Sequence, residues 1–223
     1  MASLAALKSW TKIRPSQAYI PVSWGVALLL MHSLLRLNDP VQNRVARAII
    51  TAHHLLLRVG ELLRMTKGDL LFGPLQRSGF PRDASLRIPK AKTGINQHVR
   101  VNDPHIARLL YKIWRGLPRR TDRMFPITYG VLRNRFRTAL RLIGVDETRV
   151  VFHSLRHGGA TKLAYEGLDL QLIAIRGRWK KLQNAAHYVQ VGQALITTMP
   201  LSDKLSRLKE HLEGTWDTWG AVL

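Results

Sequence analysis

The spacing of apolar residues predicts a chain built mainly from helices. Between residues 26 and 56, apolar side chains recur with the period of a helix in two separate stretches. Ser23 suits the N-cap of the first helix, and Asp39 before Pro40 is typical of a helix start, because Pro fits the first helical position. Comparable start signals precede later amphipathic runs at Asp103-Pro104, Thr128, Ser154, Asp169 and Ser202.

One region between these helices alternates with the period of a strand. Short strands are predicted at Leu70-Leu71-Phe72, at 86–88 and at 98–101, with turn residues between the last two. The pattern indicates a β-hairpin or a small three-stranded sheet with a basic tip. We therefore expect a mainly α (α+β) fold with a small antiparallel β-sheet.

The pattern also divides the chain into three parts. Residues 1–21 carry Pro15 and Pro21 without a long periodic run, which indicates an arm or linker. Residues 22–195 form one domain, and residues 196–223 form a C-terminal helical segment. Its apolar side is predicted to hold Leu205, Leu208 and Leu212, and it ends in a tail with Trp216 and Trp219.

The charge of the chain changes the picture from a fold to a partner. Lys and Arg number 35 against 14 Asp and Glu, a formal net charge of +21. Such an excess predicts a polyanionic partner, and double-stranded DNA fits better than a membrane, because the basic residues are spread along the chain. The chain has no cysteine, which excludes disulfides and thiol catalysis. With neither a signal peptide nor a membrane span in sight, we expect a cytoplasmic or nuclear, DNA-associated protein.

The residues with chemistry are concentrated in the stretch 152–190. His153 and Arg156 lie three residues apart, Trp179 follows, and Tyr188 lies nine residues after it on a helical segment. A phosphodiester needs charge stabilisation, an in-line nucleophile and a protonated leaving group, which paired arginines, a phenol and a proton donor can supply. Alone, His153 and His157 are also spaced like metal ligands, but no third ligand is evident, so we expect neither metal nor cofactor.

Three boxes in the expected order resemble the tyrosine recombinase family, the phage-integrase-like enzymes that break and rejoin DNA. RVGELLRMTKGDL (58–70) resembles the first-arginine box, HSLRHGGATKLAYEGL (153–168) the His-x-x-Arg box, and GRWKKLQNAAHYVQ (177–190) the box of the nucleophile. The resemblance covers roughly residues 22–195. Most members have His where this chain has Trp179, and most carry a further N-terminal helical domain that clamps DNA.

The resemblance implies roles for particular side chains. Arg58 and Arg156 would bind the phosphate oxygens. His153 would donate to an oxygen or help to move the tyrosine proton, and Trp179 would donate through its indole N–H and pack against the site. Tyr188 would form a covalent 3′-phosphotyrosine. Lys92, on the hairpin, would protonate the leaving oxygen, although strand spacing does not separate it from Lys90. The supporting residues are Glu61 and His157, and those expected to bind DNA are Lys90, Arg133, Arg137, Lys180 and Lys181.

The resemblance further implies site-specific recombination by a homo-oligomer, a tetramer assembled on DNA, with the C-terminal segment exchanged between protomers. Two other functions use the same residues: a type IB topoisomerase-like relaxase and a DNA-binding module without catalysis.

Overall fold

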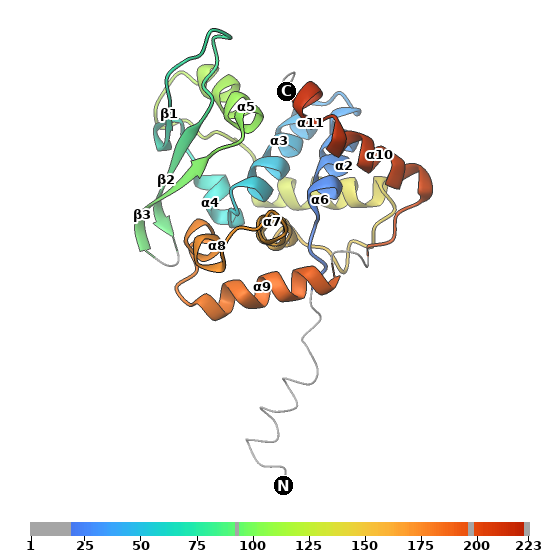
Figure 1. Cartoon of the computed structure of the whole chain (residues 1–223). Helices are drawn as coiled ribbons and strands as arrows, with labels where there is room; N and C mark the ends of the chain where they lie inside the picture. Colours follow the sequence, from blue (N-terminus) through green and yellow to red (C-terminus); the bar gives the residue numbers. More distant parts are fainter. Residues whose placement is uncertain (1–18, 92–93, 196–198, 221–223) are drawn as a thin grey trace.

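The computed structural model describes residues 19–91, 94–195 and 199–220. Helices make up most of the molecule and one small sheet lies at its side, so the mainly α fold with an antiparallel sheet is confirmed (Figure 1). In chain order the elements are α2 (Trp24–Leu35), α3 (Pro40–His54), α4 (Val59–Arg64), the short 3-10 helix η1 (Lys67–Asp69), β1 (Leu70–Phe72), β2 (Ala84–Ala91), β3 (Gly94–Val101), α5 (Pro104–Arg115), α6 (Tyr129–Leu142), α7 (Ser154–Tyr165), α8 (Leu170–Gly177), α9 (Leu182–Leu195), α10 (Asp203–Gly214) and α11 (Trp216–Trp219).

Most of the predicted helix starts are confirmed by their caps. The Ser23 hydroxyl accepts a hydrogen bond from the Val26 amide, and the Asp39 carboxylate accepts one from the Gln42 amide. The same capping by a side-chain oxygen occurs at Asp103, Thr128, Asp169 and Ser202. Local hydrogen bonds therefore set these helix starts, as the sequence predicts.

The predicted cap at Ser154 is wrong. His153 is the N-cap of α7, and Ser154 is already the first helical residue. The Ser154 hydroxyl accepts from the Val151 amide at 3.2 Å, because the chain turns tightly between these two residues. This turn places His153, rather than a serine, at the partly buried start of α7.

The sheet has the strand order β1-β2-β3 with antiparallel pairing throughout. Leu86 in the middle strand pairs with Leu70 on one side and Val99 on the other. Leu86, Ile88 and Val99 are buried in the main core. The three-stranded alternative of the sequence prediction is therefore the observed one, and β2 and β3 form its hairpin.

Two consecutive glycines bring α7 against the end of α3. A Cβ on Gly158 would lie 1.5 Å from the carbonyl oxygen of Val22, and one on Gly159 would lie 2.3 Å from that of His53. Any larger residue would separate the backbones. The close approach places the start of α7 beside the loop that follows α3, which carries Arg58.

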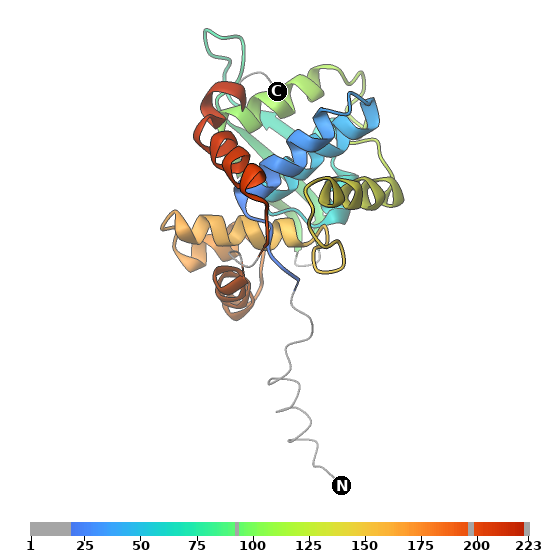
Figure 2. The ribbon, with the colours of Figure 1, turned by 90° about the vertical axis from the view of Figure 1, so that its right-hand side faces the viewer.

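The C-terminal segment packs on its own chain. α10 lies along α2, on the opposite side of α2 and α3 from α6 (Figure 2). The ring of Trp216 meets that of Trp24 edge to face at 5.2 Å, and its indole N–H donates to Asp103. Leu212 is buried, with Leu205 and Leu208 partly buried against the core, as predicted for an apolar side.

Within the part of the chain that the structure describes, no helix combines the length and apolar character that crossing a bilayer requires.

Candidate active site

Arg58 stands at the start of α4, in the loop after α3. Its guanidinium donates to Oε1 of Glu61 at 2.7 Å, and its backbone amide donates to Oε2 at 2.9 Å. Three residues separate the two partners, a spacing at which side chains on one helical turn can pair. The Arg58 side chain is 23% exposed, whereas that of Glu61 is only 3% exposed. Glu61 thus holds the Arg58 guanidinium, while part of the Arg58 side chain stays exposed to solvent.

Arg156 occupies the interior of the site. It is 1% exposed and donates to the carbonyl oxygens of Leu56 and Gly177. The indole ring of Trp179 covers its guanidinium at 4.3 Å. Burial, then the nearby charges of Arg58 and Arg178, lower the pKa of Arg156 to about 9, so the group remains a cation at neutral pH. Arg156 is therefore a second, buried cation near Arg58.

Trp179 reaches this position because the chain turns sharply after α8. A Cβ on Gly177 would lie 1.7 Å from the Trp179 ring, so only glycine fits there. The Trp179 ring in turn lies 5.0 Å from that of Tyr188 on α9. The turn thus places the Trp179 ring close to both Arg156 and Tyr188.

The phenol of Tyr188 meets His153 directly. Nε2 of His153 lies 3.0 Å from the phenolic oxygen. Burial, then the positive charges of Arg156 and Arg58, lower the pKa of His153 to about 4. The imidazole is neutral at neutral pH, and with its proton on Nδ1 it can accept the proton of Tyr188. The N-cap of α7 and helix α9 therefore bring a neutral imidazole and a phenol within hydrogen-bond distance.

His157 packs on the other side of the same phenol. Its ring centroid lies 3.9 Å from that of Tyr188 and 5.2 Å from that of His153. Burial, then the neighbouring His153, lower the pKa of His157 to about 3, so it too is neutral. His157 supports the ring of Tyr188 by packing.

Sequence reasoning missed Arg178, which is 4% exposed. It lies in the corner of the molecule that also contains Glu61 and Arg156. Its guanidinium donates to Oε2 of Glu61 at 2.7 Å and to the Leu56 carbonyl oxygen at 2.8 Å. An arginine at a helix C-cap, where glycine is common, is the one signal that the sequence offers. That signal does not reveal the partner, because Glu61 lies more than a hundred residues earlier in the chain.

The hairpin approaches the corner from the other side of α4. A pocket of about 340 Å³ is lined by Glu61 and Arg64 from this helix and by Arg87 and Lys90 from β2. Lys90 is exposed. Lys92, the predicted proton donor, lies outside the described residues.

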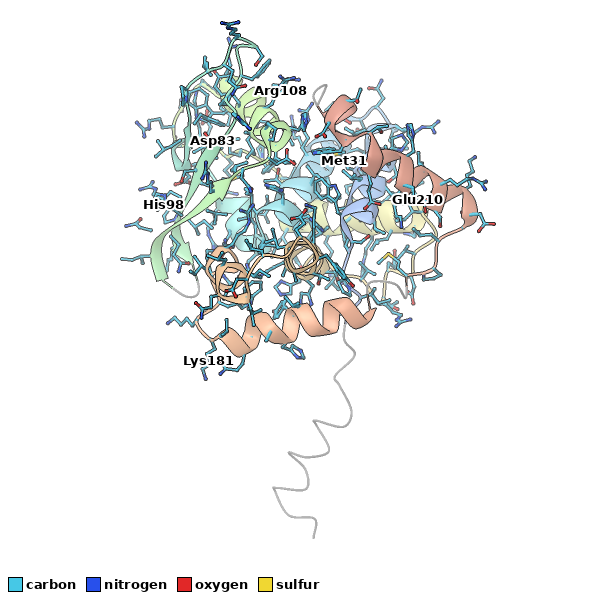
Figure 3. All side chains as sticks on the ribbon, viewed as in Figure 1. Met31, Asp83, His98, Arg108, Lys181 and Glu210 are labelled. Carbon is cyan, nitrogen blue, oxygen red and sulfur yellow. The ribbon has the colours of Figure 1, made fainter. Side chains whose placement is uncertain are left out.

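The remaining residues predicted to bind DNA lie at the surface. Arg133 is exposed and Arg137 partly buried, one helical turn apart on α6. Lys180 and Lys181 are exposed in the turn between α8 and α9, where Figure 3 labels Lys181. In the described ranges, no group of three or more His, Cys, Asp or Glu side chains is placed to hold a metal ion.

Known proteins resemble this chain in its fold and in part of its sequence. Residues 93–194 match the family described as "Phage integrase family". The matched segment contains His153, Arg156, Trp179 and Tyr188, whereas Arg58 lies before it. No curated protein matches the chain.

Several solved recombinases share the fold at low identity. The XerH site-specific recombinase, in a post-cleavage complex with a palindromic difH substrate, matches with a TM-score of 0.63 at 19% identity, over 90% of this chain and 54% of that one. The XerA recombinase gives 0.57 and 18%, over 90% and 65%. The Tn1549 transposon integrase, in complex with transposon right end DNA, gives 0.56 and 12%, over 90% and 67%. The chain thus spans about half the length of XerH.

Proposed function

We propose that this chain cleaves and rejoins DNA strands at specific sites through a covalent 3′-phosphotyrosine on Tyr188. The observation that carries the proposal is the 3.0 Å approach of His153 Nε2 to the Tyr188 oxygen. Beside them, Glu61 pairs with Arg58 and Arg178, while the nearby Arg156 donates only to backbone carbonyls. The surplus positive charge suits a phosphodiester, and the neutral imidazole suits the phenolic proton.

The cleavage step is written as a transfer at phosphorus. The Tyr188 oxygen attacks the scissile phosphorus and gives its proton to His153 Nε2. The bond from phosphorus to the 5′-oxygen breaks, and that oxygen takes a proton from an acid, which we assign to Lys92. Rejoining is the reverse attack by a 5′-hydroxyl, and the phosphodiester energy is kept in the tyrosine link.

Arg58 and Arg156 differ in how they would reach the phosphate. Arg58 is partly exposed, so a phosphate can meet its guanidinium directly. Arg156 is buried under Trp179, so its free N–H groups reach a phosphate only after the Trp179 ring shifts. DNA binding would therefore open the corner, and Trp179 would then close over the phosphate or donate from its indole N–H.

The test is covalent trapping on duplexes selected for binding, nicked so that the cleaved strand escapes. Wild-type protein is expected to form an adduct that survives denaturant, and Tyr188→Phe to form none while its DNA affinity changes little. Tyr165→Phe is the matched control, because Tyr165 is 60% exposed on α7. An adduct with Tyr188→Phe would overturn the assignment of the nucleophile, and relaxation of supercoiled DNA without strand exchange would indicate a relaxase.

The proton donor is tested with a substrate whose 5′-bridging oxygen is replaced by sulfur, a leaving group that needs little acid help. Lys92→Ala is expected to be slow on the oxygen substrate and rescued on the sulfur one. Lys90→Ala is the control without selective rescue. Rescue of Lys90→Ala instead would move the acid to Lys90.

We further propose double-stranded DNA as the partner and a tetramer as the assembly, with α10 exchanged between protomers. Both XerH and the Tn1549 integrase carry DNA in their solved complexes. In this chain α10 packs on its own α2, and Gly25 lies against Lys209. Because the chain has no cysteine, the double variant G25C/K209C reports the exchange. Oxidation on two-site DNA should link different chains, and links only within one chain would contradict the exchange.

A further inference from the structure

Arg178 is held in a backbone conformation that arginine normally avoids. Its φ is 58° and its ψ is 44°, the left-handed region in which a helix usually ends with glycine. A non-glycine residue in this region costs about 1 kcal/mol. Some contact of the Arg178 side chain must favour arginine over glycine at this position.

The contacts of the side chain are buried and polar. One terminal nitrogen donates to Glu61 Oε2 and to the Leu56 carbonyl oxygen, and the other donates to the Arg176 carbonyl oxygen at 2.9 Å. The side chains of Arg178 and Glu61 are 2% and 3% exposed. A buried ion pair is weak evidence for stability, because desolvation of the two charges offsets their attraction. A role in positioning accounts better for the pair.

Glu61 passes this restraint on to Arg58. Its Oε1 accepts from the Arg58 guanidinium, while its Oε2 accepts from Arg178 and from the Arg58 amide. Although burial opposes it, Arg178 and the hydrogen bonds from Arg58 lower the pKa of Glu61, so the carboxylate stays charged. Without Arg178, Glu61 would lose one of these three hydrogen bonds, and its whole charge would fall on Arg58, the group that a phosphate must bind.

We propose that Arg178 is a positioning residue that sets the orientation and effective charge of Arg58 through Glu61. The inference rests on the proposed function, since the scissile phosphate is what Arg58 is oriented for. It also links two boxes that are far apart in sequence, because Arg178 immediately precedes Trp179 and its partner Glu61 lies on α4.

The test compares Arg178→Gly with Arg58→Ala and with Arg176→Ala. Glycine accepts the left-handed conformation, so Arg178→Gly removes the ion pair without backbone strain. Arg176 is the matched control, because this half-buried arginine on the same helix donates to His54 and Asn102 rather than to Glu61. Thermal melting and DNA affinity of each variant are measured beside the rate of adduct formation at saturating DNA.

Two substrates separate positioning from a general loss of structure. On the ordinary phosphodiester, Arg178→Gly is expected to form adduct about 100-fold more slowly, as for loss of one charge-stabilising donor. On a duplex with an uncharged methylphosphonate at the scissile position, the defect should shrink to less than about tenfold, in parallel with that of Arg58→Ala. Arg176→Ala should match wild type on both.

Two results would overturn the inference while the proposed function stands. One is an unchanged rate for Arg178→Gly, and the other is an equal defect on both substrates, which would indicate support of the fold alone. A wild-type protein that forms no adduct with any selected duplex would instead overturn the proposed function, and this inference with it.

Discussion

The core around α2 and α3 and the corner around Arg156 are both buried, but they are built from opposite materials. The core contains apolar side chains of α2 that are at most 1% exposed, namely Leu28, Leu29, Leu30 and Met31. The corner buries two arginines that donate to backbone carbonyls and a glutamate that pairs with one of them. The first region gains free energy from burial, whereas the second gives up part of that gain to hold charges in fixed positions.

The comparison teaches that burial in this protein has two purposes. In the main core, shape is sufficient, and side chains of similar volume should be exchangeable. In the corner, each hydrogen bond fixes a group around Tyr188, so conservative changes should cost function more than stability. A change made in one region should therefore have its main effect in that region.

The largest effect is expected at Arg156, because its loss should affect both the unfolding free energy and the rate of adduct formation. Arg156→Ala removes the side-chain donor to the Gly177 carbonyl and leaves the Leu56 carbonyl with Arg178 alone, which should cost about 2 kcal/mol or more in unfolding free energy. It should also slow adduct formation by about 10³-fold. Arg58→Ala should slow adduct formation comparably with little change in stability, because Arg58 is partly exposed. Urea denaturation and single-turnover trapping measure the two quantities.

A change in the main core should show the reverse. Leu29→Ala is expected to lower the unfolding free energy by about 3 kcal/mol through the cavity that it leaves. Below the melting temperature, the rate of adduct formation per folded molecule should stay within about twofold, since the corner is packed separately. A large loss of rate at full folding would show that the two regions are coupled.

Buried histidines occur in both regions and predict a shared loss of stability in acid. Burial, opposed by the hydrogen bond to Val22, lowers the pKa of His53 to about 3, and that of His153 falls to about 4. As pH falls from about 6.5, the unfolded chain binds protons that the folded one refuses, so stability falls by about 1.4 kcal/mol per pH unit for each such histidine. Urea denaturation between pH 7 and 5 measures this slope.

His53→Gln isolates the contribution of the core to that slope. Gln keeps a donor for the Val22 carbonyl but does not titrate, so the slope should drop by the share of one proton. His98→Gln is the control, because His98 is exposed on β3 and should leave the slope unchanged. Adduct formation by wild type should stay nearly independent of His153 protonation until pH approaches 4.

The smallest effect is expected from the surface of α6, which belongs to neither region. Arg133→Ala with Arg137→Ala should weaken DNA binding and reduce the slope of log affinity against log salt by about 2, without changing the rate at saturating DNA. The Arg141→Ala variant is a control, since Arg141 is already paired with Glu147 at 2.9 Å. An unchanged salt slope in the double variant would remove α6 from the DNA interface.

The sequence by itself determined the helices, the hairpin and most of the site. Local capping oxygens and periodic apolar residues decide where helices start, and these signals act over a few residues, so they can be read from the chain. The ion pair of Arg58 with Glu61 was predictable for the same reason, because three residues separate the partners. The order of the three boxes predicted Arg58, His153, Arg156 and Tyr188 as site residues through family resemblance.

The tertiary structure alone decided how these residues meet. The burial of Arg156 beneath Trp179, the approach of His153 to Tyr188 and the role of Arg178 all depend on the packing of α7 against the end of α3 and on the turn after α8. Such contacts join residues more than a hundred positions apart. The packing that brings them together draws its free energy from excluding water, for which no short stretch of sequence carries a signal. Arg178 shows this most clearly, since its partner Glu61 becomes its neighbour only when the chain has folded.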